Sequence, residues 1–228
     1  MDPFTVCILS YYKPRRLKAC IDSILPLLRK SKDRLIIVEN SVNKYGDIHT
    51  ETRALVQWYE GSHHGLVGAI YNDENNEFSK GANQGLSLAR TEYFFLVNND
   101  TEVTDPDTFR KMIEFAKSRE KVATVTPVTL QSNGSVYCSG AFGSGAHHKD
   151  IPTEPRQSEW NNFAFVLIKK SIVSKVGYLD IGMKEYRGKR TFIGLYHSDE
   201  MFCRRCTASG YQHWVVPVKV MHYHKEGD

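Results

Sequence analysis

The feature that most constrains this fold is the alternation of short apolar runs with helix-like segments over the first hundred residues. Apolar runs at 6–9, 35–38, 66–71 and 93–97 have the length of buried strands. Between them, apolar residues recur at helical spacing. Parallel strands need a crossover, usually a helix, to return to one sheet. The alternation therefore predicts an α/β fold, a mostly parallel sheet with helices on both faces. The predicted helices are a segment begun by Pro14 and shortened by Pro26, then 50–59 and 79–90, the last with Ser79 as its cap.

The pattern loosens after Asp100. Residues 143–159 are rich in Gly, His and Pro without periodicity, which predicts a loop, and the basic stretch Lys184–Arg190 predicts a second, solvated loop. The alternative for that stretch is that Arg187, Lys189 and Arg190 contact an anionic ligand. We predict helices at 105–118, 171–176 and 199–209, the last closed by Gly210, and strands at 122–128, 136–142, 163–168 and 214–222.

Composition excludes several classes of protein. Of 228 residues, 41% are hydrophobic and 25% charged, which argues against a disordered or collagen-like chain. No window approaches 18 uninterrupted apolar residues, so no transmembrane segment is predicted. The net charge of +4 lacks the concentrated basic stripe of a nucleic-acid binder. An odd number of cysteines without a framework suggests reduced thiols: Cys7, Cys20, Cys138, Cys203 and Cys206.

Polar side chains follow three of the predicted parallel strands at the point where each strand ends. In open α/β sheets, ligands bind in the crevice beyond the carboxyl ends of the strands. Any one of these residues could instead be a turn residue that satisfies its own backbone. Together they predict one polar crevice, formed by Ser10 and Tyr12 after the first strand, Glu39 and Asn40 after the second, and Asn98, Asn99 and Asp100 after the fourth.

Asp100 is the candidate metal ligand of this crevice. One carboxylate flanked by amides cannot form an all-protein cage, but it can hold Mn²⁺ or Mg²⁺ that takes its other ligands from water and phosphate oxygens. Such a cation would neutralise the charge that builds on a departing diphosphate. The alternative is an Asx turn, which the same three residues also suit.

Seven segments in order resemble the family 2 glycosyltransferases, nucleotide-sugar-dependent enzymes with the GT-A fold. The resemblance covers residues 5–224 and implies a single GT-A domain over 1–228, with a Rossmann-like sheet and a smaller antiparallel part on the acceptor side. Residues 1–100 would be the nucleotide-binding half and 101–228 the acceptor-binding half. The segments are 6–12, 36–41 (Asp-Asn-x-Ser-like), 78–85 (Gly-rich helix start), 93–101 (Asp-x-Asp-like), 177–180 (Gly-Phe-Asp-like), 197–211 (Glu-Asp-x-Asp…Arg…Gly-Tyr-like) and 217–222.

The resemblance also implies an activity and the residues that carry it. The activity is inverting transfer of a sugar from a UDP- or dTDP-sugar to a hydroxyl of a glycan or similar acceptor, with divalent-metal assistance. Asp199 takes the position of the catalytic base, and His222 that of a metal ligand opposite Asp100, although a surface histidine is the alternative. Donor binding falls to Ser10, Tyr12, Glu39, Asn40, Asn98 and Asn99, with Lys80, Gly81 and Asn83 at a helix start suited to diphosphate or ribose.

Asp199 meets the chemical requirement for the base. An inverting transfer needs a carboxylate within hydrogen-bond reach of the acceptor hydroxyl as that oxygen attacks. The predicted position at a helix N-terminus stabilises the ionised carboxylate, which predicts a competent proton acceptor without raised basicity. An ordinary N-cap without a catalytic role is the alternative. Glu200 is the nearest rival as base.

The sequence departs from the family pattern at several positions, which keeps a second function open. A loss of carboxylates would leave a catalytically silent nucleotide-sugar or glycan-binding protein of the same fold. Glu39 replaces an Asp that receives the nucleobase, and Tyr12 replaces an Asn and is placed to stack on the base. The carboxylates that the family carries are replaced by Asn98, Ser198 and Met201.

Two further alternatives come from other motifs. Cys203 and Cys206 have CxxC spacing, and with His222 and His224 they would make a structural zinc site. A nucleotidyltransferase would share the nucleotide-binding half, but it would carry a longer Gly-rich loop than residues 10–16 provide.

One sequon bears on the compartment. Asn99-Asp100-Thr101 is an N-glycosylation acceptor inside the predicted metal site, and a glycan there would block the crevice. No secretion signal is visible at Met1-Asp2-Pro3-Phe4. We therefore expect a cytoplasmic protein, in peripheral contact with a membrane if a membrane carries the acceptor.

Overall fold

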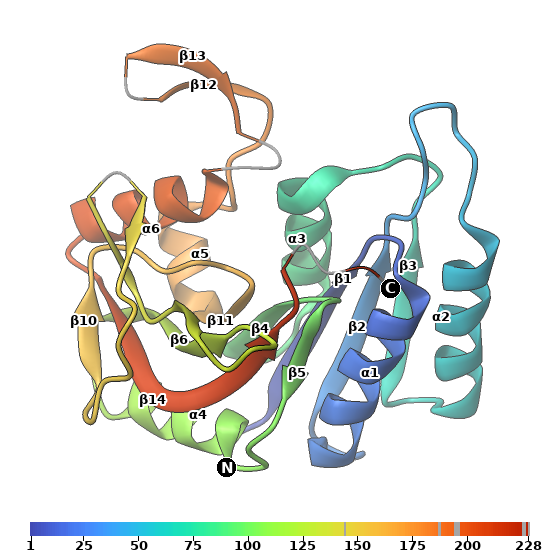
Figure 1. The fold of residues 1–228 in the computed structure, drawn as a ribbon, viewed down its shortest axis with the longest axis horizontal. Coiled ribbons are helices and arrows are strands. Elements are labelled where there is room, and N and C mark those ends of the chain that lie inside the picture. The colour runs from blue at the N-terminus through green and yellow to red at the C-terminus, as the bar shows by residue number, and fades with distance from the viewer. Residues whose placement is uncertain (144, 187, 194–196, 225–226, 228) are drawn as a thin grey trace.

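The structure is a computed structural model that describes residues 1–143, 145–186, 188–193, 197–224 and 227. Its first half is a parallel sheet with the strand order β3-β2-β1-β4 (Figure 1). Cys7 lies between Ile36 of β2 and Leu96 of β4, and every residue of β1 is buried. The bounds are β1 Phe4–Ser10, β2 Arg34–Glu39, β3 Val67–Tyr71 and β4 Tyr93–Asn98.

The second half continues this sheet with mixed strand directions. In the described part of the chain, ten strands form one sheet, in which β11 runs antiparallel to β4 and β6, whereas β14 runs parallel to β6. Strands β5 and β10 pair antiparallel with β14, and β7 pairs antiparallel with β6. The bounds are β5 Thr101–Val103, β6 Val122–Leu130, β7 Val136–Cys138, β10 Arg156–Ser158, β11 Phe165–Lys169 and β14 Gln212–His222.

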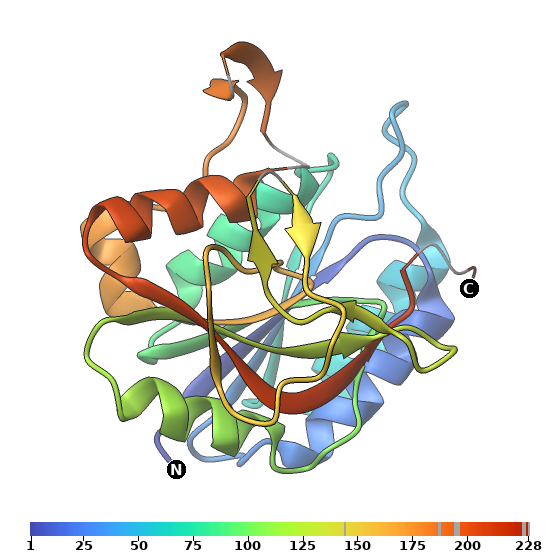
Figure 2. The ribbon, with the colours of Figure 1, turned by 60° about the vertical axis from the view of Figure 1, so that its left-hand side comes forward.

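Helices cover both faces of the sheet, each over its own apolar core. One core joins α1, α2 and α4 to the sheet, and the other joins α3, α5 and α6 to its opposite face (Figures 1 and 2). This arrangement confirms the predicted α/β class. Pro14 begins α1, and the helix ends two residues before Pro26, which sits in a short 3₁₀ turn, Leu25–Leu27. The bounds are α1 Pro14–Ile24, α2 Thr50–Ser62, α3 Glu77–Leu88, α4 Thr108–Lys117, α5 Lys170–Val176 and α6 Ser198–Ala208.

Two small hairpins stand outside the main sheet. The first pairs β8 (Ala141–Phe142) with β9 (Ala146–His147), and the second pairs β12 (Met183–Tyr186) with β13 (Lys189–Phe192). Figures 1 and 2 show the second hairpin projecting from the body of the protein. Among the described residues, no helix is both long and apolar enough to cross a bilayer.

The structure corrects several sequence-based boundaries. The predicted strand at 136–142 is broken at Gly140, whose φ of 97° turns the chain. The predicted loop at 143–159 contains β9 and β10, because the chain pairs there with sheet edges that the local pattern does not reveal. The basic stretch Lys184–Arg190 belongs to the second hairpin, and Arg187 lies outside the described residues.

Helix α3 also begins earlier than predicted and lies unusually close to the sheet. It starts at Glu77 after Asn76, so Ser79 is a buried residue inside the helix and not its cap. A Cβ atom at Gly81 would lie 2.8 Å from Nδ2 of Asn40, and one at Gly85 would overlap the side chain of Cys7. These two glycines let α3 approach β1, which brings the start of α3 to the carboxyl end of the sheet.

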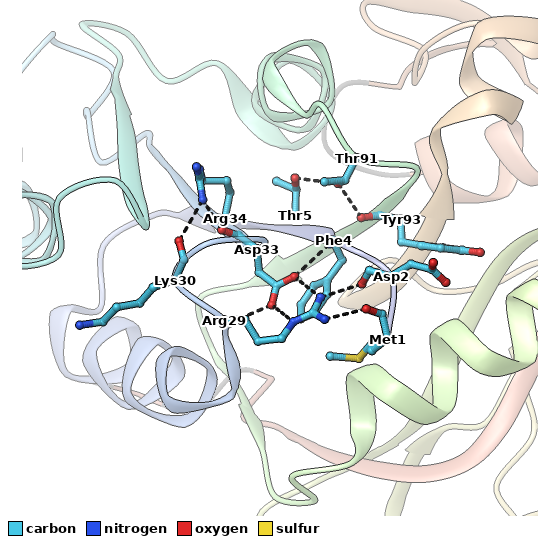
Figure 3. A network of polar contacts seen from close by, with 10 residues as sticks. All are labelled: Met1, Asp2, Phe4, Thr5, Arg29, Lys30, Asp33, Arg34, Thr91 and Tyr93. Carbon is cyan, nitrogen blue, oxygen red and sulfur yellow. Dashed lines mark hydrogen bonds and ion pairs between the residues drawn. The ribbon is translucent and has the colours of Figure 1, made fainter.

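An ion pair between Arg29, which is partly exposed, and the buried Asp33 fixes the start of β1 (Figure 3). The Arg29 guanidinium donates to both carboxylate oxygens of Asp33, at 2.7 Å from Nε and 2.6 Å from Nη2. The backbone N–H of Phe4 donates to the same carboxylate at 3.2 Å, and Nη1 of Arg29 donates to the carbonyl of Met1 at 2.6 Å. The Asp33 carboxylate is fully buried, so this network joins the chain before β1 to the turn before β2.

Candidate active site

Two adjoining hollows form a crevice at the carboxyl ends of β1 and β4. The strand-end hollow, about 300 Å³, is lined by Ser10, Asn40, Asn99 and Asp100 among others. The α6 hollow, about 320 Å³, includes residues from α6, β7 and the end of β14. Phe78 and Asn98 line both, so the two hollows are neighbours. The α6 hollow is completed by Tyr137, Asn162, Phe163, Ala164, His197, Ser198, Asp199, His222 and His224.

The Asp100 carboxylate faces His222 across this crevice. Nε2 of His222 lies 3.4 Å from Oδ1 of Asp100, and Nζ of Lys13 lies 3.7 Å from Oδ2. The pairing of β14 with β5 sets this geometry, since His222 is in register with Thr101. Burial alone would raise the pKa of Asp100, but His222 and then Lys13 outweigh it and hold the pKa below its ordinary value. Asp100 is therefore a carboxylate at neutral pH.

This pair has the chemistry of an incomplete metal site. Oδ1 of Asp100 and Nδ1 of His222 are buried without a hydrogen-bond partner. Oδ1 of Asp100 and Nε2 of His222 lie 3.4 Å apart, so both can reach a divalent cation whose ligand distances are roughly 2.0–2.1 Å. Over the described ranges, no group of three His, Cys, Asp or Glu side chains gathers that could hold a metal ion. The residues present thus suit a divalent cation that takes its remaining ligands from water or from a bound molecule.

Asp199 lies in the first turn of α6 and lines the α6 hollow together with His222. Its Oδ1 accepts a hydrogen bond of 2.8 Å from the backbone N–H of Glu200. Burial raises the pKa of Asp199 to about 6, although backbone N–H groups of Glu200 and Phe163 counteract part of the effect. The expectation of no raised basicity was wrong, because desolvation of the carboxylate outweighs the helix dipole.

The rival carboxylate of α6 is engaged elsewhere. Glu200 is 2% exposed, and its Oε1 accepts from Arg204 at 2.8 Å (Nε) and 2.7 Å (Nη2). It does not line either hollow. The N-cap of α6 is His197, at a left-handed φ of 67°, so Asp199 is not the capping residue. Of the two acids in this turn, Asp199 is the one that faces the crevice.

Among the residues that follow β1 and β4, some line the crevice and others support its wall through hydrogen bonds. Ser10 and Asn98 line the crevice, and the Ser10 hydroxyl is buried without a partner. Asn99 is buried, and its Nδ2 donates to the carbonyls of Tyr11 at 3.3 Å and Tyr12 at 2.9 Å. Asn99 therefore fixes the turn after β1, where Tyr12 adopts a φ of 53° and contacts the His49 ring at a centroid distance of 4.9 Å.

The second strand end is held by internal contacts. Glu39 is fully buried, and its carboxylate accepts from the Ser41 backbone at 2.7 Å and from Nε of Arg53 at 3.2 Å. Asn40 lines the strand-end hollow, but its Nδ2 donates to the carbonyl of Glu77 at 3.2 Å. Glu39 and Asn40 thus brace the wall at the end of β2.

The three predicted residues of α3 lie outside the lining of the crevice. Lys80 is exposed, and Gly81 is buried against Asn40. Asn83 both donates to the carbonyl of Leu179 at 2.9 Å and accepts from its N–H at 3.0 Å. Because α3 begins at Glu77, these residues fall in its interior rather than at its N-terminal end. Asn83 holds the chain after α5.

Sequence reasoning missed the aromatic side of the crevice. The ring of Tyr137, on β7, lies 4.9 Å from the His222 ring and 5.2 Å from the His224 ring, measured between centroids. Burial raises the pKa of Tyr137, which keeps its hydroxyl protonated. His147 of β9 contacts the same ring at 6.0 Å, whereas His148 packs against Phe142. No motif signals Tyr137, because the pairing of β7 with β6 alone places it here.

The structure contradicts the zinc-module alternative. Cys203 and Cys206 are fully buried in the apolar core between α6 and the sheet. His222 instead faces Asp100 in the crevice. All four proposed ligands are among the described residues, and they do not form one cluster. The CxxC spacing here is a helical i, i+3 pair that packs one face of α6.

Comparison with known proteins agrees with this geometry. Residues 5–177 match the sequence model of glycosyl transferase family 2. Three solved structures share the fold at 12–14% sequence identity and confirm the GT-A architecture. The mannosyltransferase PcManGT from Pyrobaculum calidifontis, in complex with GDP-Man and Mn²⁺, gives a TM-score of 0.68 at 13% identity over 97% of this chain and 57% of that one.

The other two are GalNAc-T7 with UDP, GalNAc and Mn²⁺, and TarS (residues 1–349) from S. aureus. GalNAc-T7 gives a TM-score of 0.71 at 14% identity over 98% of this chain and 44% of that one. TarS gives 0.68 at 12% identity over 97% and 60%. The chain therefore spans about half the length of the solved structures it matches. No curated protein matches the sequence.

Proposed function

This chain belongs to glycosyl transferase family 2, and on that premise we propose that it transfers a sugar from a UDP- or dTDP-sugar to a hydroxyl of a glycan or similar acceptor, with inversion at the anomeric carbon. One observation carries the proposal. Asp199 and His222 line the same hollow, and His222 also faces the Asp100 carboxylate at 3.4 Å. A candidate base and a candidate cation site thus meet at one crevice.

The donor would lie across the carboxyl ends of β1 and β4. We assign residues 1–100 as the nucleotide-binding half and 101–228 as the acceptor-binding half of one domain. Ser10 and Asn98 offer polar groups to the nucleotide, and the Ser10 hydroxyl is free to bond it. Glu39, Asn40 and Asn99 support these two residues, because their own side chains are already hydrogen-bonded within the wall of the crevice.

Tyr12 and the predicted residues of α3 do not line the crevice, so their proposed roles are less direct. Asn99 bonds the backbone of Tyr12, whose ring lies 4.7 Å (centroids) from that of Tyr11, a residue that lines the strand-end hollow, and we assign Tyr12 to stack on the base. Gly81 and Asn83 position α3 and the chain after α5, and Lys80 lies on the exposed side of the helix. The choice of a pyrimidine nucleotide rests on the family resemblance. The complex of GalNAc-T7 with UDP is in keeping with it, whereas that of the mannosyltransferase contains GDP-Man.

Asp100 and His222 would hold Mn²⁺ or Mg²⁺. Oδ1 of Asp100 supports this, because it is buried without a hydrogen-bond partner and lies 3.4 Å from Nε2 of His222, and two of the similar structures contain Mn²⁺. When bound, the cation would neutralise the charge that develops on the leaving diphosphate. Lys13, 3.7 Å from Asp100, adds a second positive charge at the same end of the crevice. The lowered pKa of Asp100 keeps the carboxylate ionised for this role.

Asp199 would take the proton of the acceptor hydroxyl as its oxygen attacks the anomeric carbon. A pKa near 6 makes the carboxylate a stronger base than an ordinary Asp while leaving it mostly ionised at pH 7.5. Apolar walls from Phe78 and Phe163 limit water at this point, and Tyr137 offers a phenolic hydroxyl beside them. These groups define where the reacting sugar and the acceptor meet.

The cytosol is the compartment we propose for this reaction. Asn99 of the sequon is 7% exposed, and its amide nitrogen bonds the turn after β1. A glycan on that nitrogen would remove one of its two N–H donors and fill the crevice. Contact with a membrane would follow only from an acceptor anchored there.

The decisive experiment is product analysis. The wild-type protein is incubated with UDP-, dTDP- and GDP-sugars, Mn²⁺ and a panel of hydroxyl acceptors, and the linkage formed is read by NMR. We expect transfer from a uridine or thymidine donor with inverted anomeric configuration, and loss of transfer in Asp199→Asn. Donor binding without transfer or hydrolysis across the panel would instead identify a catalytically silent binding protein. Retained configuration would contradict the inverting mechanism.

A further inference from the structure

A cavity separate from the crevice lies at the amino ends of the parallel strands. It measures about 400 Å³ and is lined by the starts of β1, β2 and β3, by the turn before β2 and by the end of α3 with the residues that follow it. Thr5 of its lining and Ser10 of the crevice stand at opposite ends of β1, roughly 16 Å apart along the strand. A cavity of this size is in the range that binds small molecules. We call it the basal cavity.

The basal cavity exists because one face of the sheet lacks a covering side chain there. Helix α3 packs on this face and ends at Leu88, which lines the cavity. Gly68 of β3 is in register with Ile36 of β2, so both residues belong to the same face. A Cβ atom at Gly68 would have nothing within 4 Å. Ile36 is therefore partly exposed although β2 lies between two other strands, and it gives the cavity an apolar floor.

Every charged side chain that lines the basal cavity is positive. Lys32, Arg34 and Arg90 all line it and are all exposed, and no Asp or Glu lines it with them. Nη1 of Arg34 donates to the carbonyl of Asp33 at 2.7 Å, which orients the guanidinium without neutralising it (Figure 3). The Asp33 carboxylate is engaged by Arg29. Three like charges around one hollow attract an anion.

The hydroxyl groups of the lining are already bonded. The Thr5 and Thr91 hydroxyls lie 2.9 Å apart, and the Thr91 hydroxyl donates to the carbonyl of Tyr93 at 3.1 Å (Figure 3). Thr5 therefore donates its proton to Thr91, and neither hydroxyl has a proton left for a ligand. Among the side chains of the lining, the three cations are the donors that remain. The cavity thus combines an apolar floor with donors that all carry positive charge.

The free edge of β3 is closed to a further strand, which excludes one kind of acidic partner. β3 is the last strand of the sheet. The N–H of Val67 donates to the carbonyl of His63 at 3.0 Å, and the N–H of Ala69 donates to Oε1 of Glu60 at 3.0 Å. A peptide strand added at this edge would have to displace both bonds. The cavity therefore suits a compact ligand rather than an extended peptide paired with β3.

We propose that the basal cavity binds an anionic amphiphile, a molecule with an apolar body and a phosphate or carboxylate head. The apolar body lies over Ile36 and Gly68, and the head contacts Arg34 and Arg90. The inference does not depend on the proposed glycosyltransferase function, because the basal cavity and the crevice share no lining residue. Both free small molecules and the acidic lipids of a bilayer have this chemistry, and the experiment below separates the two sources.

Filling the cavity tests its position. Octyl phosphate is the probe, titrated by calorimetry into the full chain at concentrations at which it is monomeric, without nucleotide or metal. Gly68→Leu places a side chain in the cavity, and the open space around this glycine admits it. Gly61→Leu is the matched control, because Gly61 also faces open space but lies on α2. We expect saturable binding of octyl phosphate, at least tenfold weaker in Gly68→Leu and within twofold of wild type in Gly61→Leu.

Removing charge tests the head group and provides a second variant should Gly68→Leu fold poorly. Arg34→Gln combined with Arg90→Gln should weaken binding of octyl phosphate at least tenfold. Arg110→Gln combined with Arg119→Gln removes the same charge from α4 and the turn after it, and should change binding less than threefold. Octanol, octyltrimethylammonium and inorganic phosphate should each bind at least tenfold more weakly than octyl phosphate.

Several results would overturn the proposal. Absence of saturable binding, or equal binding by wild type and Gly68→Leu, would exclude the basal cavity as the site. Octanol or inorganic phosphate binding as tightly as octyl phosphate would exclude an anionic amphiphile as the ligand. An equal loss of binding in the two arginine pairs would show a general effect of net charge.

Flotation with vesicles of phosphatidylcholine and phosphatidate identifies the source of the ligand. Flotation of the wild type that is lost in Gly68→Leu supports the site and assigns its ligand to a bilayer. Binding of octyl phosphate without flotation supports the site and assigns its ligand to a free small molecule. Neither measurement uses a sugar donor, so a failure of the proposed function would leave both results unchanged.

Discussion

Nε2 of His222, the last residue of β14, lies 3.4 Å from Oδ1 of Asp100, which follows β4. The two side chains are far apart in the sequence, and the antiparallel pairing of β14 with β5 brings them together. Nδ1 of His222 and Oδ1 of Asp100 are buried without hydrogen-bond partners. A folded chain seldom leaves such atoms unsatisfied unless something else satisfies them.

The first prediction concerns the pH dependence of transfer. The pKa of Asp199 is raised to about 6, so the base is protonated, and inactive, below that pH. At saturating donor and acceptor, we expect the rate to rise about tenfold per pH unit up to pH 6 and to level off above it. The measurement is kcat between pH 4.5 and 8. A rate that stays constant down to pH 4.5 would exclude Asp199 as the base.

The second prediction is that Asp199→Asn is more stable than wild type at pH 7.5 although it has lost transfer. Because the folded-state pKa lies above the ordinary 3.8, the contribution of this carboxyl to stability is complete below pH 3.8 and is lost as the pH rises through about 6. The neutral amide of Asp199→Asn does not ionise, so the variant avoids this loss of unfolding free energy, which is at most about 3 kcal/mol. The melting temperature should rise by several degrees at pH 7.5 and hardly at pH 4.

Glu200→Gln is the control for this prediction. Glu200 is 2% exposed, and the substitution replaces the negative charge that pairs with Arg204 by a neutral amide. We expect it to lower the melting temperature while transfer continues. A loss of transfer in Glu200→Gln that matches the loss in Asp199→Asn would move the role of base to Glu200.

The third prediction concerns the contact between α3 and β1. A Cβ atom at Gly85 would overlap the side chain of Cys7, so Gly85→Ala should cost about 1–3 kcal/mol of unfolding free energy. Gly61, in α2, has open space around its Cα, and Gly61→Ala should stabilise by about 0.5–1 kcal/mol. Chemical denaturation of both variants measures the two signs. Equal effects of the two substitutions would show that α3 is not held this closely to the sheet.

The fourth prediction concerns the buried network of Figure 3. Arg29→Met leaves the fully buried Asp33 carboxylate without its counter-charge, which should cost about 3 kcal/mol. Arg110→Met removes ion pairs with Asp107 and Glu114 that are largely exposed, and it should cost no more than about 1 kcal/mol. Thermal unfolding separates the two. A smaller loss in Arg29→Met than in Arg110→Met would contradict the structural role of Asp33.

The parallel half of the fold could be predicted from the sequence because each of its strands is buried on both faces. The run Tyr93–Val97 has no polar residue to place on a solvent face, and such a run suits only the middle of a sheet covered by helices. The start of α1 could also be predicted locally, because proline is favoured at the first position of a helix and Pro14 stands there. These features depend on neighbours in sequence.

The second half could be predicted less well because its pairings join distant segments. Strands β9 and β10 are two and three residues long, and pairing alone makes them strands. The hairpin that contains Lys184 and Arg190 is strongly polar, so its sequence is typical of a loop. Tyr137 reaches the crevice for the same nonlocal reason.

The sequence predicted which strand-end residues line the crevice, but it did not predict their burial or their bonding partners. That Asp100 and Asp199 lie at one crevice follows from the order of the motifs, and the structure has both lining it. The basicity of Asp199 could not be predicted, because it depends on how tightly the surrounding chain excludes water from the carboxylate. The bonds that engage Glu39 and Asn83 likewise depend on Arg53 and Leu179, which no motif connects to them.

The most direct measurement is a calorimetric titration of UDP and of TDP into the wild-type protein and Asp100→Asn, each with and without Mn²⁺. We predict that Mn²⁺ tightens binding of one or both nucleotides to the wild type at least tenfold, and that Asp100→Asn retains the metal-free affinity but loses this gain. Affinities that are the same with and without Mn²⁺, or a gain that survives in Asp100→Asn, would contradict a cation held by Asp100 and His222.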